Sequence, residues 1–119
     1  MTAEFVVYGN PLPQPRPRVV KGKAVSNWDP KVKEWRKKVA TECSKHFNAP
    51  LPGPVGLHLS FCRSNARAVD IDNLAKCVVD AMQGIAYYDD AQVSYLEAFK
   101  RIDVMERPYV LITIRAMEP

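Results

Sequence analysis

The chain has 119 residues, of which 47% are hydrophobic and 25% charged, as in an ordinary globular domain. This length fits one compact domain, 1–119, and no apolar run approaches the roughly 20 residues that span a bilayer. The first residues carry an acid where a signal peptide has bases, so the expected location is the cytoplasm.

The charge is unevenly distributed along the chain, whose net charge is +4. Residues 14–38 hold nine Lys/Arg against two acids, a net of +7, so the rest of the chain sums to −3. A basic segment beside an acidic one favours a polyanionic partner held near a cation site. A solvated charged loop and helix face is the equally open alternative.

The three cysteines Cys43, Cys62 and Cys77 lie far apart and form no C-x-x-C pair. An odd, unclustered set argues against a disulfide framework and against a zinc site. We expect them to be small buried hydrophobic residues.

In chain order, residues 4–8 predict a short strand, and residues 9–27, with four prolines, predict an extended loop without ladder hydrogen bonds. Asp29-Pro30 is a typical helix start. The following helix has an apolar stripe for the core, formed by Val32, Trp35, Val39, Cys43 and Phe47.

Residues 55–62 alternate in hydrophobicity as a half-buried strand does, with His58 on the less apolar face. An acidic helix is expected from residue 70, and two further strands over 91–103 and 107–117, joined through 104–108 as a hairpin. The buried stripe of the expected acidic helix is formed by Leu74, Cys77, Val78, Ala81, Met82 and Ile85. The order predicts an α+β domain: a small mixed sheet of about four strands with two helices packed on one face.

Residues 70–90 hold five aspartates and a single base, Lys76. Asp70 and Asp72 stand two residues apart at a helix start, and Asp89-Asp90 follow in a turn. If the turn returns beside the helix start, the carboxylates would select a hard cation, above all Mg²⁺ with Mn²⁺ as a substitute. The structural alternative is capping, an Asp72–Lys76 helix pair and simple turn residues.

The motifs D-I-D-N-L-x-K at 70–76, DAM at 80–82 and DDAQV at 89–93 resemble the signature of RusA-family Holliday junction resolvases. The resemblance implies a Mg²⁺- or Mn²⁺-dependent homodimer, often phage or prophage encoded. Such a dimer nicks opposing strands of four-way DNA junctions in recombination and repair. It implies metal-binding catalytic roles for Asp70, Asp72 and Asp90, an essential role for Lys76, and supporting roles for Asn73, Asp80 and Asp89.

The segment before Asp70 is less basic than the family pattern, since it offers only Arg63 and Arg67. We therefore expect part of the DNA contact to come from residues 9–27, called the proline-rich segment below. The predicted DNA-binding residues are Arg16, Arg18, Lys21, Lys23, Arg63 and Arg67. The alternative functions are a non-catalytic basic nucleic-acid-binding module, a Mg²⁺ nuclease that prefers flaps, forks or RNA, and a structural phage protein.

Overall fold

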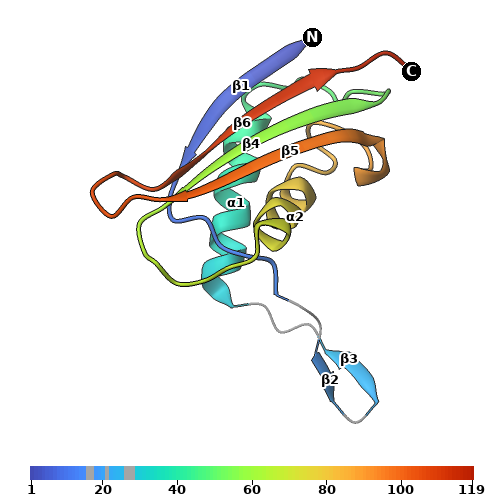
Figure 1. The fold of residues 1–119 in the computed structure, drawn as a ribbon. Helices are drawn as coiled ribbons and strands as arrows, with labels where there is room; N and C mark the ends of the chain where they lie inside the picture. The colour runs from blue at the N-terminus through green and yellow to red at the C-terminus, as the bar shows by residue number, and fades with distance from the viewer. Residues whose placement is uncertain (16–17, 21, 26–28) are drawn as a thin grey trace.

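The computed structural model describes residues 1–15, 18–20, 22–25 and 29–119 (Figure 1). The strands are β1 (Thr2–Tyr8), β2 (Arg18–Val20), β3 (Lys23–Val25), β4 (Val55–Arg63), β5 (Val93–Ile102) and β6 (Tyr109–Ala116). The helices are α1 (Pro30–Ser44), α2 (Ile71–Ala81) and the short 3₁₀ helix η1 (Asp90–Gln92). In this described part of the chain, no helix is long and apolar enough to cross a membrane.

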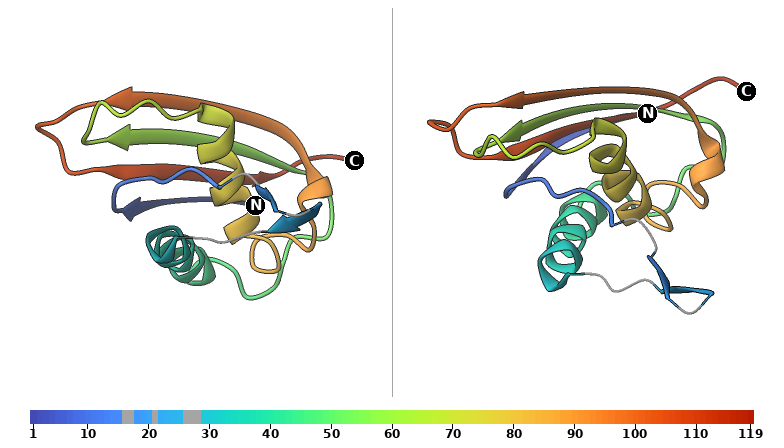
Figure 2. Two further views of the ribbon diagram at one scale, coloured as in Figure 1. Left: turned by 90° about the horizontal axis from the view of Figure 1, so that it is seen from below. Right: turned by 60° about the horizontal axis from the view of Figure 1, so that its bottom comes forward.

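The main sheet has four strands in the order β1-β6-β4-β5. β6 pairs antiparallel with both β1 and β4, whereas β5 pairs parallel with β4 and forms one edge. Both α1 and α2 lie against one face of this sheet, α1 toward β1 and α2 toward β5 (Figure 2). The predicted α+β class, with a mixed sheet and two helices on one face, is confirmed.

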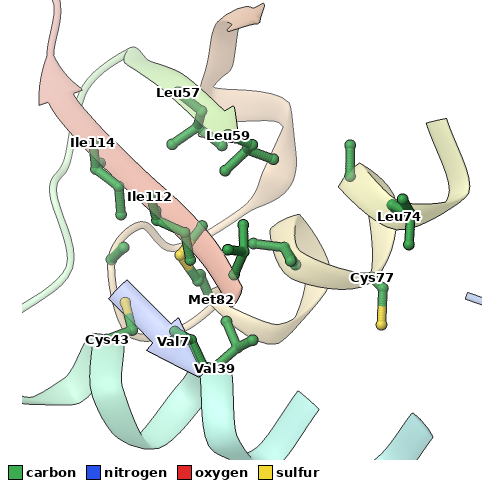
Figure 3. Close-up of a cluster of buried hydrophobic side chains, with 14 of the residues drawn as sticks. Val7, Val39, Cys43, Leu57, Leu59, Leu74, Cys77, Met82, Ile112 and Ile114 are labelled. Carbon is green, nitrogen blue, oxygen red and sulfur yellow. The ribbon is translucent and has the colours of Figure 1, made fainter. Parts of the chain in front are cut away.

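The core forms between the helices and the inner face of the sheet (Figure 3). The helix α1 begins where the sequence predicts, since the Asp29 carboxylate accepts from the N–H of Lys31 at 2.8 Å. The predicted stripes are buried on both helices, apart from the outer members Phe47, Ala81 and Ile85, which are partly buried. All three cysteines are buried and free, as expected.

Two expectations about connections are wrong. The segment after Tyr8 is not strand-free, because β2 and β3 pair antiparallel within it. The four prolines all precede residue 18, so the backbone N–H groups of these short strands are available for pairing. The strands β5 and β6 form no hairpin, since β4 lies between them and pairs with both. The 104–108 connection therefore crosses the end of β4.

Candidate active site

One solvent-facing side of α2 carries ionised groups in a row. Asp72, Lys76 and Asp80 are spaced four residues apart, so they lie above one another on the helix surface. Leu74, Cys77 and Val78, on the other side, are fully buried. The packing of this buried side therefore fixes which way the charged row faces.

The helix start is held by main-chain contacts. Asp70 is the N-cap residue, but its side chain makes no capping hydrogen bond. The carboxylate of Asp72 accepts from the N–H of Asn73 at 3.0 Å, and the carbonyl of Asn73 accepts from the N–H of Gln14 at 3.0 Å. The proline-rich segment is thereby attached to the start of α2.

Asp80 contacts both the proline-rich segment and Lys76. Its Oδ2 accepts from Gln14 Nε2 at 2.9 Å and lies 3.6 Å from Lys76 Nζ. The partner of Lys76 is thus the acid toward the helix C-terminus, whereas the sequence suggested Asp72. Gln14 and Asp80 together restrict where the Lys76 ammonium group can lie.

Asp89 and Asp90 form a second carboxylate group before β5. Asp89 caps η1 by accepting from the N–H of Ala91 at 2.8 Å. The N–H of Asp90 donates to Gln83 Oε1 at 3.3 Å, which places this turn beside the C-terminal end of α2. The two carboxyl groups share a side-chain hydrogen bond.

The turn that carries Asp89 and Asp90 is fixed by a residue that the sequence left without a role. Gln92 Nε2 donates to the carbonyls of Leu51 at 2.6 Å and Gly53 at 2.8 Å, while its Oε1 accepts from the N–H groups of Tyr88 and Asp89. These four hydrogen bonds use the full capacity of the amide. Gln92 belongs to the DDAQV motif, but its hydrogen-bond partners at 51–53 are remote in sequence. The motif alone therefore did not reveal this role.

The carboxylates gather at the two ends of α2. The helix has 11 residues and a length of about 16 Å, with Asp70 and Asp72 at its start and Asp90 near its end. Within the described ranges, no three His, Cys, Asp or Glu side chains lie close enough together to hold one ion. The return of the turn to the helix start, which was the condition for one shared carboxylate site, is therefore not observed. Each end still offers two carboxylates, which suits Mg²⁺, since this ion takes one or two from a protein alongside water and phosphate oxygens.

The Asp89–Asp90 pair has opposite pKa changes. The pKa of Asp90 is raised, first by its hydrogen bond with Asp89, then by desolvation and the charges of Asp89 and Asp80. The pKa of Asp89 is lowered, first by the N–H of Ala91 and then by the hydrogen bond with Asp90. Asp90 therefore keeps its proton to a higher pH than an ordinary aspartate does.

Asp89→Asn is expected to move the titration midpoint of Asp90 to lower pH in the metal-free protein. Asparagine still caps η1, but it removes the negative charge that favours the protonated form of Asp90. Carboxyl ¹³C NMR titration in the presence of EDTA measures the midpoint. An unchanged or higher midpoint for Asp90 would contradict this assignment of the cause.

A groove of about 930 Å³ lies at the start of α2 between the proline-rich segment and the loop at 64–70. Asp70 and Asn73 line it together with Arg67 and Lys100. Lys100 Nζ also donates to the carbonyl of Val69 at 2.7 Å, which holds the loop against β5. Asp70, at the start of α2, thus faces a groove with basic groups, which suits a bound phosphate backbone.

Arg63 also lines this groove, but its side chain is engaged within the protein. It is only 2% exposed, and its guanidinium donates to the carbonyls of Pro11 at 3.2 Å and Arg67 at 2.7 Å. Burial, followed by the nearby charge of Arg67, lowers the pKa of Arg63. The expected surface role of Arg63 in DNA contact is therefore replaced by a structural one: it ties the proline-rich segment to the loop before Asp70.

Arg63→Ala is expected to lower the free energy of unfolding by about 2–3 kcal/mol, because the carbonyl of the buried Pro11 and the partly buried carbonyl of Arg67 lose a charged donor. Arg67→Ala, an exposed change in the same loop, is expected to stay within about 0.5 kcal/mol of wild type. Urea denaturation of both variants measures the difference. Equal stabilities would show that the Arg63 contacts are not structural.

The remaining predicted DNA-binding residues belong to the β2–β3 segment. Arg18 begins β2 and Lys23 begins β3. Arg16 and Lys21 lie outside the described residues. β2 and β3 form a separate two-stranded sheet that projects from the body of the domain (Figure 1).

The fold and site define a small α+β domain in which α2 carries a row of carboxylates and a lysine, and Asp70 at its start lines a groove with basic groups. This is the arrangement of proteins that act on phosphodiesters. The family model of the endodeoxyribonuclease RusA matches residues 8–115, and the chain belongs to that family. It is also 30% identical, over an alignment of 136 positions, to the uncharacterized protein YqaN of Bacillus subtilis (strain 168). That alignment covers 94% of each chain. The class is therefore that of the Holliday-junction-resolving endonucleases.

Proposed function

We propose that this protein is a Mg²⁺-dependent endonuclease, with Mn²⁺ as a substitute, that resolves Holliday junctions by paired nicks in opposing strands. It would act as a homodimer, since two symmetric subunits suit two opposed cuts. The observation that carries the proposal is the family match over residues 8–115, joined to carboxylates at a groove with basic groups. The proposal includes one RusA-like domain over 1–119, acting in the cytoplasm on DNA, with a phage or prophage origin.

The proposed Mg²⁺ ligands are Asp70 and Asp72 at the start of α2 and Asp90 near its end, each end contributing carboxylates to ion binding rather than all three side chains holding one ion as the chain stands. When bound, Mg²⁺ would supply Lewis-acid stabilisation of the phosphate and a more acidic water. The ammonium group of Lys76 would stabilise the charge that develops on the scissile phosphate or position the attacking water. In this scheme the carboxylates and Lys76 are the catalytic residues.

Three neighbouring residues would support the proposed catalytic residues. Asp80 contacts Lys76 and so orients its ammonium group. Asp89 shares a hydrogen bond with Asp90, and Asn73 donates its N–H to Asp72. None of the three needs to touch the DNA for these contacts to matter.

The proposed DNA contacts begin at the groove with Arg67 and extend to the β2–β3 segment through Arg16, Arg18, Lys21 and Lys23. Their number makes affinity strongly dependent on salt, because each neutralised phosphate releases counterions. Arg63 would contribute indirectly, through the loop that it holds in place.

Cleavage assays with four-way junction, duplex, flap, fork and RNA substrates, each with Mg²⁺ or EDTA, test the proposal. We expect paired nicks in the junction with Mg²⁺ and none with EDTA. Preferential cutting of flaps, forks or RNA would favour a nuclease of different selectivity. Binding without any cleavage would identify a non-catalytic nucleic-acid-binding module instead.

A further inference from the structure

The two edges of the main sheet differ in what they expose. On the outer edge strand β5, Phe99 is 60% exposed, and Leu96 and Ile102 are each 48% exposed. The opposite edge strand, β1, exposes Thr2, Glu4 and Tyr8, of which one is a large hydrophobic residue. A ten-residue edge strand with exposed apolar side chains offers unpaired backbone groups to another strand, and proteins normally cover or interrupt such an edge.

The exposed apolar side chains of β5 lie on both faces of the sheet. Leu96 pairs in register with the buried Leu57 and so shares the helix side, whereas Phe99 pairs with Ser60 on the face that the helices leave uncovered. An apolar patch on one face would suit a helix or a flat surface. Apolar groups on both faces of one edge instead suit a strand that continues the sheet.

We propose that a second copy of this chain pairs its own β5 antiparallel with β5, which forms one continuous sheet across a two-fold axis. This deepens the proposed function, because it rests on the proposed homodimer and assigns its surface. A second copy is the natural occupant because the same strand then supplies both halves of a self-complementary contact.

The charges on β5 restrict the register of this pairing. Opposite residues share a sheet face and successive residues alternate between faces, so one residue of β5 must lie on the axis. Placing Glu97 or Lys100 there sets like charges opposite each other, which is destabilising. Placing Ala98 there sets Glu97 opposite Phe99 and Lys100 opposite Leu96, so each charge meets an apolar side chain.

Placing Phe99 on the axis avoids like charges and leaves Lys100 as the one charged residue of β5 opposite an apolar residue, Ala98. Phe99 then faces its own copy, Glu97 faces Arg101, and Leu96 faces Ile102. Aromatic pairs and opposite charges are the cross-strand pairs that stabilise antiparallel sheets. In this register Glu97 and Arg101, which also contact Tyr95 and Glu106 within their own chain, lie opposite each other with complementary charge.

The pairing also arranges the two candidate active sites. Since α2 packs toward β5 and α1 toward β1, the two α2 helices become the helices nearest the axis (Figure 2). The combined sheet has eight strands, twice the four of one chain. Both carboxylate rows then lie on the same side of that sheet, where one four-way junction can meet both.

Phe99→Lys tests the surface, because two lysines would face each other on the axis. We expect its mass in size-exclusion chromatography with light scattering to fall from twice the 13.4 kDa chain mass to that mass. The dimer dissociation constant should rise at least about a hundredfold, since symmetry counts the change twice. Thr2→Lys, at an exposed position of β1 on the opposite edge of the sheet, is the control and should remain dimeric.

Cross-linking tests the register without destabilising the protein. Phe99→Cys should form an intermolecular disulfide under mild oxidation, because opposite residues lie within disulfide reach. Ser94→Cys should not, since its two copies would be about 34 Å apart along the strands. The natural cysteines are all buried, so they contribute little background.

A dimeric wild type with a monomeric Phe99→Lys variant and a Phe99→Cys cross-link supports the inference. If Phe99→Lys stays dimeric, or Ser94→Cys cross-links as readily as Phe99→Cys, the surface or its register is wrong. A monomeric wild type overturns the dimer itself. Failure of the nuclease proposal is separate from all of these, because it appears as a dimeric wild type that cuts no junction in Mg²⁺.

Discussion

Asp72→Asn is expected to slow cleavage of a four-way junction at least about a hundredfold at saturating Mg²⁺. Asp72 is exposed and occupies the first turn of α2, where asparagine can still accept from the N–H of Asn73. The substitution therefore removes a negative charge and a proposed metal ligand while the helix start stays formed. Loss of metal-ion stabilisation of the transition state is worth several kcal/mol, and each tenfold in rate corresponds to about 1.4 kcal/mol.

The matched control is Glu4→Gln on β1, at the opposite edge of the sheet. Its amide oxygen can still accept from the Thr113 hydroxyl, which lies 3.3 Å from the Glu4 carboxylate. This variant should cleave at the wild-type rate. Isothermal titration with Mg²⁺ should show weaker binding for Asp72→Asn alone. Wild-type cleavage by Asp72→Asn would remove this residue from the active site.

Lys76→Ala is expected to reduce the cleavage rate about a hundredfold while leaving Mg²⁺ binding intact. The ammonium group is exposed apart from its 3.6 Å contact with Asp80, so its removal should cost little stability. Loss of one positioned electrostatic group commonly costs a factor of about 100–1,000 in rate. Single-turnover cleavage, with metal binding measured in parallel, separates this result from that of Asp72→Asn.

Lys45→Ala controls for the loss of a helix-surface ion pair. Lys45 contacts Glu42 at 2.7 Å at the end of α1 and lies outside the candidate site. We expect unchanged cleavage for this variant. If Lys76→Ala also cleaves normally, the contact between Lys76 and Asp80 is only an ordinary surface pair, and the lysine has no part in the chemistry.

Substitutions at the two ends of α2 are expected to have different effects. Asp70 lines the groove with basic groups and Asp72 follows it in the first turn, whereas Asp90 is held near Asp80 and Gln83. Changes at the start should affect metal and DNA together. Changes around Asp89 and Asp90 should alter proton and metal binding, because their carboxyl groups share a hydrogen bond.

Local features of the fold could be read from the sequence because they depend on neighbouring residues. The Asp29 cap and the buried stripe of α2 follow from a short side chain and a helical period. The pairing of the last two strands could not be read in this way. Adjacent strands often form a hairpin, but here β4 lies between β5 and β6 because it pairs with both.

The candidate site also combines features that the sequence predicted with features that it did not. Its residue types, five aspartates and Lys76 in one segment, were fixed by the sequence, and so was the family resemblance that the match over 8–115 confirms. The grouping of these side chains in space could not be read from the sequence. Which acid contacts Lys76, and which carboxyl raises the pKa of Asp90, depend on side chains brought together in space.

The sequence by itself therefore determined the two main helices, the four strands of the main sheet, the family and the chemistry-bearing residues, because periodicity and motifs are written in consecutive positions. Only the tertiary structure decided the order of the strands, the burial of Arg63, the four hydrogen bonds of Gln92 and the apolar edge of β5. Each of these joins segments that are remote along the chain. Their contacts are selected by the packing of one shared core, which no local pattern encodes.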